Sequence, residues 1–189
     1  MIGVLALQGG VREHAQMLAD LGQEVLLVRN AEHLAQIDGL VLPGGESSTI
    51  DRILRRFEMR EALIDRLQQI PVLGTCAGLI MLARHLVNPA PEQETLGILD
   101  IDVRRNAFGP QRDSAVAQID TAYGLVSAAF IRAPEIVRIG SEGGMLELIA
   151  LVDGRIVGVA GPKAIGISFH PELTGDQTIH REFLKLVSN

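Results

Sequence analysis

The chain has 189 residues, of which 47% are apolar and 21% are charged, and it contains no tryptophan. This length fits one globular domain at roughly 150 residues per domain, and the composition excludes extended disorder. The net charge of −6, without a lysine-rich run, excludes the broad electrostatic attraction that binds nucleic-acid backbones. No apolar stretch approaches the ~18 residues of a membrane span. We therefore expect residues 1–189 to form a single domain that binds neither nucleic acid nor a membrane.

The cysteine content and the N-terminus bear on the cellular setting. Cys76 has no second cysteine with which to form an intramolecular disulfide, which favours a reducing, cytoplasmic location. The apolar residues 1–7 have no basic segment before them and no small-residue cleavage site after them. They therefore predict a buried strand rather than a signal peptide.

The first half of the sequence alternates short apolar runs with helical patterns, which is typical of a parallel α/β sheet. In chain order, we predict a strand at 2–7, a turn at 8–10, a helix at 11–21 ended by Gly22, strands at 24–28 and 39–42, one or two helices within 47–67, a strand at 71–74 and a helix at about 77–87.

The second half of the sequence has a different pattern. A polar, proline-bearing loop at 88–95 precedes short apolar runs at 98–103, 115–119, 128–132, 136–139, 146–152 and 155–160. Asp153-Gly154, between two of these runs, is a strong signal for a two-residue hairpin turn. We expect these runs to add antiparallel strands to the sheet, before a last strand at 165–169 and a helix at about 176–188.

The segment around Cys76 carries the strongest chemical signal. The strand at 71–74 meets a helix through Gly-Thr-Cys-Ala-Gly at 74–78, the spacing of a nucleophile elbow, whose glycines permit a tight turn. The N-terminal end of the helix favours a thiolate, and the Ala77 N–H is placed to bind an oxyanion formed when that thiolate attacks a carbonyl. The alternative is a buried structural cysteine beside a glycine-rich turn, which the strand, glycine spacing and helix together make the weaker interpretation.

A thiolate nucleophile needs a base, and His170 is the best candidate. Alternation along the last predicted strand places His170 and Glu172 on one side, so the carboxylate can fix the imidazole tautomer and leave the other ring nitrogen for Cys76. A histidine at a strand end is by itself a weak signal, but together with the elbow it favours catalysis. The remaining histidines have no such carboxylate partner in the sequence pattern and are predicted to be structural: His14, His33, His85 and His180.

A third segment, Pro-Gly-Gly-Glu-Ser-Ser at 43–48, follows the strand at 39–42. Its glycines can turn backbone N–H groups inward as a second oxyanion donor or an anion cradle, while Ser47 or Ser48 can cap the following helix. The sequence contains no Walker loop, no G-x-G-x-x-G after a strand and no zinc-ligand spacing of Cys and His. We expect neither a cofactor nor a metal.

These motifs resemble those of the class I (triad) glutamine amidotransferases, and more closely those of the glutaminase subunit of pyridoxal 5'-phosphate synthase. The class is indicated by Pro-Gly-Gly-Glu at 43–46, Gly-Thr-Cys-Ala-Gly at 74–78 and His-Pro-Glu at 170–172. The subfamily is indicated by segments at 7–14, 44–49, 105–109, 130–134 and 168–174, which occur in order over nearly the whole chain.

The resemblance implies a fold and a reaction. The fold is α/β, a flavodoxin-like three-layer sandwich with a mostly parallel central sheet and added antiparallel strands. The reaction is the hydrolysis of L-glutamine to L-glutamate and ammonia through a cysteine thioester. The ammonia is passed to a synthase subunit in a hetero-oligomeric complex, for the synthesis of pyridoxal 5'-phosphate.

The resemblance also assigns roles to residues. It implies Cys76 as the nucleophile, His170 as general base and acid, and Glu172 as the group that orients the imidazole. It further implies an oxyanion hole at Gly45 and Ala77, and contacts with glutamine from Gly45, Glu46, Ser47, Arg105, Ile131 and Arg132. For Arg105 and Arg132 the alternative is an ordinary surface salt bridge.

Two other functions remain open from the sequence. One is a glutaminase of the same class that serves another synthase, such as imidazole glycerol phosphate synthase, although the segments at 105–109 and 130–134 argue against it. The other is a protein without amidase activity whose elbow cysteine is reactive, such as a redox sensor or a chaperone. A redox sensor or chaperone of this kind does not require His170 and Glu172.

A basic helix face is a candidate docking surface for the partner. The predicted helical region bears Arg52, Arg55, Arg56 and Arg60, and residues 52, 56 and 60 share one helical face. A solvated basic face is the simpler interpretation.

Overall fold

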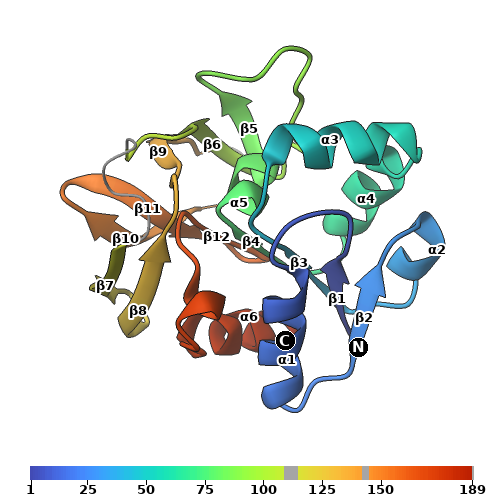
Figure 1. Cartoon of the computed structure of the whole chain (residues 1–189), viewed down its shortest axis with the longest axis horizontal. Coiled ribbons are helices and arrows are strands. Elements are labelled where there is room, and N and C mark those ends of the chain that lie inside the picture. Colours follow the sequence, from blue (N-terminus) through green and yellow to red (C-terminus); the bar gives the residue numbers. More distant parts are fainter. Residues whose placement is uncertain (109–114, 142–144, 189) are drawn as a thin grey trace.

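The computed structural model describes residues 1–108, 115–141 and 145–188. One sheet runs through the molecule, with its main path in the order β2-β1-β3-β4-β12-β11-β10-β7-β8 (Figure 1). This arrangement confirms the expected α/β fold, in which antiparallel strands extend a parallel sheet. Gly109, the last residue of the motif at 105–109, lies outside the described residues.

The parallel half of the sheet contains the strands predicted in the first half of the sequence and the last strand of the chain. They are β1 (Ile2–Leu5), β2 (Val25–Val28), β3 (Gly39–Leu42), β4 (Val72–Thr75) and β12 (Ala164–Ile167). β1 pairs with β2 and β3, and β4 pairs with β3 and β12, all in parallel. The carboxyl ends of these strands therefore lie along one edge of the sheet.

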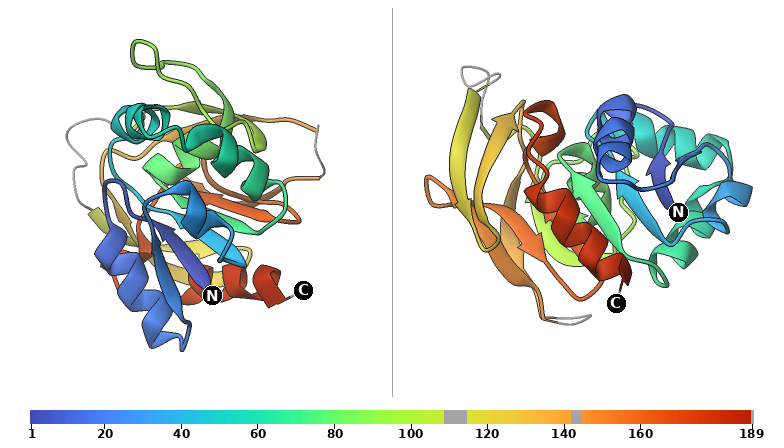
Figure 2. Two further views of the ribbon diagram at one scale, coloured as in Figure 1. Left: turned by 90° about the vertical axis from the view of Figure 1, so that its right-hand side faces the viewer. Right: turned by 90° about the horizontal axis from the view of Figure 1, so that it is seen from below.

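Helices cover both faces of this half (Figures 1 and 2). One face is covered by α1 (Val11–Asp20) and α6 (Thr178–Ser188), and the other by α2 (Ala31–Leu34), α3 (Ser47–Arg56), α4 (Arg60–Leu67) and α5 (Ala77–Leu82). The result is three layers. No helix among the described residues is long and apolar enough to cross a lipid bilayer.

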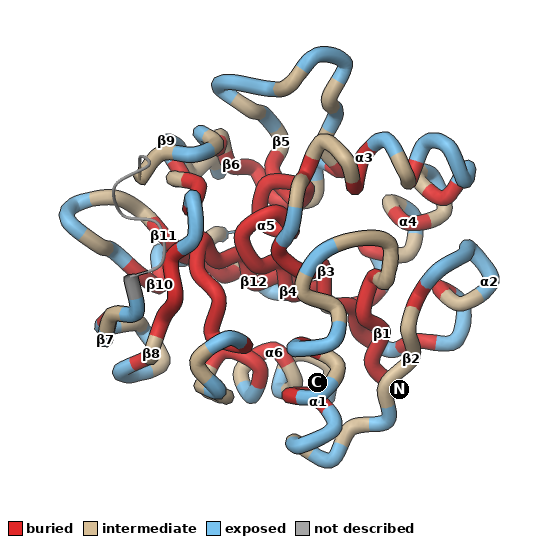
Figure 3. Tube along the Cα trace, viewed as in Figure 1, coloured by how far each residue is buried: buried red, intermediate tan, exposed pale blue. Residues whose placement is uncertain are grey.

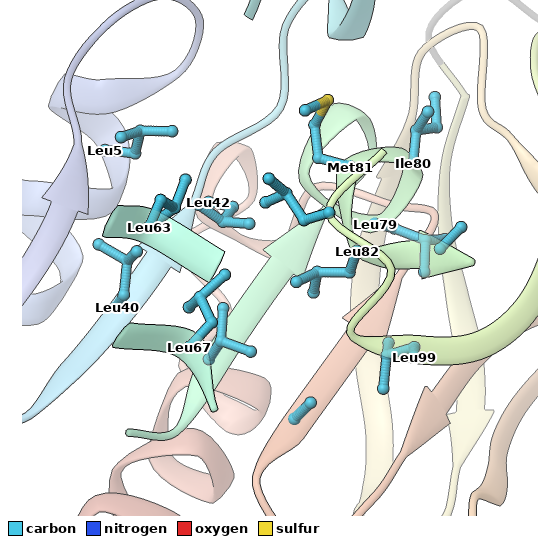
Figure 4. Packing of buried hydrophobic residues seen from close by; sticks show 14 of the residues in the cluster. Leu5, Leu40, Leu42, Leu63, Leu67, Leu79, Ile80, Met81, Leu82 and Leu99 are labelled. Atoms are coloured by element: carbon cyan, nitrogen blue, oxygen red, sulfur yellow. The ribbon is translucent and has the colours of Figure 1, made fainter. Parts of the chain in front are cut away.

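Alternate strand residues feed two cores on opposite faces of the sheet. Leu40 and Leu42 of β3 pack with Leu63 of α4 (Figure 4), whereas Val41 between them belongs to the core that contains Phe183 of α6. Burying each such aliphatic side chain contributes about 1.5–3 kcal/mol. Figure 3 shows the buried trace following β1, β3, β4, β12 and α5, so the strands that carry the site are held on both sides.

The antiparallel half supplies the rest of the sheet. Its strands are β6 (Leu99–Arg104), β7 (Ala115–Thr121), β8 (Gly124–Phe130), β9 (Glu135–Ile139), β10 (Glu147–Val152) and β11 (Arg155–Ala160). β11 pairs with β12 and so joins the two halves. Asp153 and Gly154 have φ of 50° and 75°, as a type I′ turn requires, so the predicted hairpin between β10 and β11 is confirmed.

The predicted helix at 77–87 is wrong beyond Leu82. The chain becomes extended at Ala83 and continues as β5 (Ala83–Leu86), which pairs in parallel with β6. The carbonyl oxygens of Met81 and Ala83 accept from the backbone N–H groups of Leu96 and Gly97, at 2.7 and 3.2 Å, instead of from the next turn of a helix. Tertiary pairing therefore overrides a favourable helical sequence.

The expected arginine face is also wrong. α3 ends at Arg56, and Arg60 begins a separate helix, so residues 52, 56 and 60 do not share one helix. Arg55 donates to the Glu92 carbonyl oxygen at 2.9 Å, and Arg60 donates to the Thr95 carbonyl oxygen at 2.6 Å. These two arginines hold the loop at 88–95 against the helices.

Candidate active site

The candidate site lies where the carboxyl ends of β3, β4 and β12 meet (Figure 1). The glycine segment at 43–47 continues from β3, Cys76 follows β4, and His170 comes shortly after β12. Three segments that are far apart in the sequence therefore reach one edge of the sheet, which is where ligands bind in open α/β folds.

Cys76 occupies a strained turn between β4 and α5. Its φ of 48° lies in the left-handed region, which a non-glycine residue adopts only where the surrounding structure holds it. The Cys76 backbone N–H donates to the Ile167 carbonyl oxygen at 2.8 Å. Gly78 lets α5 pack closely on β3, because a Cβ there would overlap the Leu42 carbonyl oxygen. The predicted turn thus has the geometry of a nucleophile elbow.

His170 lies between Cys76 and Glu172. Its Nδ1 is 2.7 Å from Glu172 Oε1, and its backbone N–H donates to the Ala129 carbonyl oxygen at 2.8 Å. Burial lowers the pKa of His170, but hydrogen bonds with Cys76 and Glu172, and the negative charges of both, raise it to about 10. The imidazolium form of His170 therefore persists at neutral pH next to the Cys76 sulfur.

Gly44 makes room for the imidazole. A Cβ at this position would overlap Cε1 of His170. The Gly44 carbonyl oxygen also accepts from the Gly10 backbone N–H at 3.0 Å, which ties the segment to the turn after β1. The glycine segment therefore packs directly on the base as well as lining the cleft.

Two buried histidines lie behind Glu172. His14 Nε2 is 3.0 Å from Thr75 Oγ1 and 3.4 Å from Glu172 Oε1, and His14 Nδ1 is 2.9 Å from His180 Nε2. The expectation that His14 has no carboxylate partner is therefore wrong, because α1 carries it to Glu172. His33 bonds instead to the Leu27 carbonyl oxygen, and His85 is exposed.

A hydrogen-bond network forms another wall of the site. Arg105 donates to Glu46 Oε1 at 3.2 Å and to Gln93 Oε1 at 2.8 Å, and Gln93 donates to Ser47 Oγ at 2.9 Å. The cap of α3, expected at Ser47 or Ser48, is instead Glu46, whose carboxylate accepts from the Ser48 backbone N–H at 3.4 Å. The partners of Arg105 are therefore residues of the site itself, and not those of an ordinary surface salt bridge.

A cleft of about 400 Å³ opens over these groups. Its lining includes nine of the ten predicted site residues: Gly45, Glu46, Ser47, Cys76, Arg105, Ile131, Arg132, His170 and Glu172. Ala77, the predicted oxyanion donor, is fully buried at the first position of α5 and does not line the cleft. Arg132 makes no ion pair with any described residue and is exposed.

Gln8 and Gln93 belong to the site although the sequence analysis did not select them. Gln8 Oε1 accepts from the Glu46 backbone N–H at 2.8 Å, which helps to hold the segment at 43–47. Its position directly after the strand predicted at 2–7 is the signal that could have identified Gln8. Gln93 had none, because it lies in a polar loop that only the folded structure brings to Ser47 and Arg105.

The described parts of the chain contain no group of three or more His, Cys, Asp or Glu side chains placed to hold a metal ion. The chemistry that this arrangement can perform is nucleophilic: a cysteine sulfur, a protonated imidazole and an orienting carboxylate lie at a cleft large enough for an amino acid.

Comparisons with known proteins agree with this geometry. The chain matches the model of the SNO glutamine amidotransferase family over residues 4–189. It is 45% identical over 190 residues to "Pyridoxal 5'-phosphate synthase subunit PdxT" of Mycobacteroides abscessus, covering 99% of this chain and 97% of that protein. It is 48% identical over 194 residues to the protein of the same name from Kineococcus radiotolerans, covering 98% and 94%.

Solved structures show the same similarity. A crystal structure titled as a glutamine amidotransferase superimposes with a TM-score of 0.91 at 42% identity, covering 100% of this chain and 99% of that one. A glutamine amidotransferase from Thermotoga maritima superimposes with a TM-score of 0.59 at 15% identity, covering 97% and 84%, which shows a shared fold alone. With a family match over nearly its whole length and close relatives of matching length, this chain belongs to the SNO glutamine amidotransferase family.

Proposed function

We propose that this protein is the glutaminase subunit of a pyridoxal 5'-phosphate synthase, hydrolysing L-glutamine to L-glutamate and ammonia. The observation that carries the proposal is the placement of His170 between the Cys76 thiol and the Glu172 carboxylate at the floor of the cleft. The names of relatives at 45% and 48% identity support the choice of synthase over that of the imidazole glycerol phosphate pathway.

In the first half-reaction, the Cys76 thiolate attacks the side-chain amide carbon of glutamine. The backbone N–H of Gly45, which lines the cleft, is one donor to the charge that develops on the amide oxygen, and we assign the second to the N–H of Ala77, which is buried but adjoins Cys76 at the start of α5. The His170 imidazolium donates its proton to the amide nitrogen, the C–N bond breaks, and ammonia leaves. A γ-glutamyl thioester remains on Cys76.

In the second half-reaction, water hydrolyses the thioester. His170, now neutral, takes a proton from water as its oxygen attacks the thioester carbon. The tetrahedral intermediate collapses with cleavage of the C–S bond, which releases glutamate and restores both the thiolate and the imidazolium. Glu172 accepts from Nδ1 throughout, so the Nε2 side of the ring serves sulfur, ammonia and water in turn.

The opposite end of glutamine carries an α-amino and an α-carboxylate group, and the cleft offers charges for both. Arg132 and Arg105 supply positive charge for the carboxylate, and Glu46 supplies an acceptor for the amino group. Gly45, Ser47 and Ile131 complete the contacts. Ile131 also places its carbonyl oxygen 3.9 Å from Cys76 Sγ, so this segment reaches the nucleophile itself.

We further infer that residues 1–189 act as one glutaminase domain, because a single sheet carries residues of both halves into the cleft. Ammonia is rapidly protonated in water, so its transfer to a synthase subunit requires docking around the mouth of the cleft. We place the reaction in the cytoplasm, where the thiol of Cys76 stays reduced.

The test is glutamate release from glutamine by the purified chain, alone and with the pyridoxal 5'-phosphate synthase subunit, with Cys76→Ala as the blank. We expect little activity alone and strong stimulation by the synthase subunit. Full activity without that subunit would support the mechanism through Cys76, His170 and Glu172 but contradict the assignment of this glutaminase to the pyridoxal 5'-phosphate synthase. No activity in either condition, with Cys76 still alkylated by iodoacetamide, would favour a reactive-cysteine protein that is not an amidase.

A further inference from the structure

Glu172 is a deeply buried charged group of the site. Its side chain is 1% exposed, and Oε1 lies 2.7 Å from His170 Nδ1. The other oxygen, Oε2, is buried without a hydrogen-bond partner among the described residues. A buried carboxylate that bonds to the base through one oxygen needs a further group to fix its orientation, because any rotation would move the imidazole with it.

His14 of α1 approaches that same carboxylate from behind. Its Nε2 is 3.4 Å from Glu172 Oε1 and 3.0 Å from the hydroxyl oxygen of Thr75, the residue before Cys76. His14 is fully buried and does not line the cleft, so it cannot touch substrate. One side chain therefore contacts both the group that orients the base and the strand end that carries the nucleophile.

The protonation of this contact can be derived from its chemistry. Burial, together with the repulsion that a proton on His14 would meet from protonated forms of His180 and His170, holds the pKa of His14 well below its usual value, so the ring is neutral and carries one proton. Two groups face Nε2: the Thr75 hydroxyl, which can accept or donate, and the Glu172 carboxylate, which can only accept. A proton on Nε2 suits both, whereas an unprotonated Nε2 would face Glu172 Oε1 with lone pair against lone pair. Nδ1 must then accept, and its partner at 2.9 Å is His180 Nε2.

His180 of α6 fits this arrangement. Burial lowers its pKa to about 4, against the opposing charge of Asp176, so it too is neutral at pH 7. If its proton is on Nε2, its Nδ1 carries a lone pair. Nδ1 is buried with no hydrogen-bond partner among the described residues. Leaving an acceptor without a partner raises the free energy of the folded state less than leaving an N–H donor without one. The favoured chain is thus His180 Nε2–H to His14 Nδ1, and His14 Nε2–H to Thr75 Oγ1 at 3.0 Å, with Glu172 Oε1 beside it at 3.4 Å.

We propose that His14 is a positioning residue for the glutaminase reaction: its Nε2–H, bonded to Thr75 and directed also at Glu172, keeps Glu172 in place and through it His170, while His180 fixes the His14 tautomer. This proposal rests on the proposed function for the reaction that is positioned. The contact itself rests on the geometry of four elements, α1, β4, α6 and the short turn of 3-10 helix at Pro171–Leu173, which meet behind the site.

Two amide substitutions separate this role from simple packing. In His14→Gln, the amide nitrogen takes the place of Nε2 and retains a donor toward Glu172. In His14→Asn, the shorter side chain places its amide at the Nδ1 position, toward His180 only. Both remove the ring and both carry an amide, so they differ in one methylene group and in which nitrogen of the imidazole they replace.

The variants are assayed in complex with the synthase subunit. We expect His14→Asn to lower kcat roughly 10- to 100-fold with little change in KM, as loss of an orienting hydrogen bond does elsewhere. His14→Gln should recover most of that loss. In a Glu172→Gln background, His14→Asn should have almost no further effect, because the group through which it acts is already changed.

Two measurements do not depend on glutamine turnover. In His14→Asn, the pH midpoint of Cys76 alkylation by iodoacetamide should rise by about one pH unit, because a displaced Glu172 stabilises the imidazolium less. In the unmodified protein, the ¹⁵N chemical shifts of the His14 ring should show the neutral Nε2–H tautomer from pH 5 to 8, which requires no variant to fold.

The proposal is wrong if His14 carries its proton on Nδ1. It is equally wrong if His14→Gln and His14→Asn lose activity in proportion to their melting temperatures, with the alkylation profile unchanged, because that pattern is packing. An unmodified protein that hydrolyses no glutamine, yet shows the expected tautomer and alkylation shift, would contradict the proposed function and leave the contact between His14 and Glu172 in place.

Discussion

The two halves of the sheet contribute different kinds of groups to the same cleft. The parallel half delivers the nucleophile, the base and the glycine segment from the ends of β4, β12 and β3, each fixed by pairing on both sides. The antiparallel half contributes Ile131 and Arg132 from the end of β8 and Arg105 from the end of β6. This division predicts that bond making depends on the parallel half, whereas substrate affinity depends on both: Ile131, Arg132 and Arg105 act with Gly45, Glu46 and Ser47 of the glycine segment.

The largest expected effect comes from the nucleophile in the parallel half. Cys76→Ala should lower glutamate release by at least about 10,000-fold, because no other group in the cleft can form the thioester. The fold should be retained, since alanine fits the small space of the thiol. Turnover in complex with the synthase subunit, together with circular dichroism, checks both points. Activity within tenfold of the unmodified protein would remove the mechanism.

Gly44 offers a second test of the parallel half. A Cβ at this position would overlap Cε1 of His170, so Gly44→Ala should displace the base and lower kcat roughly 100-fold with little change in KM. Gly10→Ala is the matched control, because it lines the same cleft and its Cβ would lie 3.7 Å from Glu172 Oε1, an ordinary contact. Equal effects of the two substitutions on kcat would contradict the argument.

Arg105 tests the antiparallel half. Arg105→Ala should raise KM for glutamine about 10- to 100-fold, the worth of a hydrogen bond to a charged group, and change kcat less. Its neighbour Arg104 pairs with Glu135 at 3.3 Å, is half-exposed and does not line the cleft. Arg104→Ala is therefore the control and should leave KM unchanged. A fall in kcat alone for Arg105→Ala would break the division between the halves.

The smallest effect concerns stability in acid. The folded pKa of His180 is about 4, below the ordinary value of 6.5, so between these values the unfolded chain binds a proton that the folded chain does not. The contribution of His180 to the free energy of unfolding is therefore fully present above pH 6.5 and is lost as the pH falls toward 4. From pH 7 to pH 5, the loss from His180 is about 2 kcal/mol.

Urea unfolding at pH 7 and pH 5 measures this loss. His180→Gln should make the free energy of unfolding less dependent on pH, whereas His85→Asn, at an exposed position, should leave the dependence unchanged. The antiparallel half has no histidine between residues 98 and 160, so it should add nothing to the effect. An unchanged slope in His180→Gln would show that His180 is already charged in the folded protein.

The same division explains how much the sequence predicted. In the parallel half, strands with continuous apolar runs, the glycines at 44, 45, 74 and 78 and the His-Pro-Glu turn are local signals, and local signals were sufficient to locate Cys76, His170 and Glu172. The hairpin at Asp153-Gly154 was equally local. These features depend on residues adjacent in the chain, so a single sequence reveals them.

What the sequence did not predict depends on distant partners. The segment at 83–86 has a helical pattern but becomes β5 because it pairs with β6 and because the backbone N–H groups of Leu96 and Gly97 donate to the carbonyl oxygens of Met81 and Ala83. Gln93 gains its place from Ser47 and Arg105, and His14 gains its place from Glu172. In each case the deciding neighbour lies far along the chain, and no spacing rule connects the two.

The place of β12 has a consequence for the order in which the molecule can assemble. It is the last strand along the chain, yet it lies between β4 and β11 and pairs with both. Until it inserts, the two halves cannot join and His170 cannot reach Cys76. We therefore expect folding of this sheet to end with this long-range step, and a growing chain on the ribosome to acquire its reactive thiol–imidazole pair only after β12 and residue 170 have been synthesised.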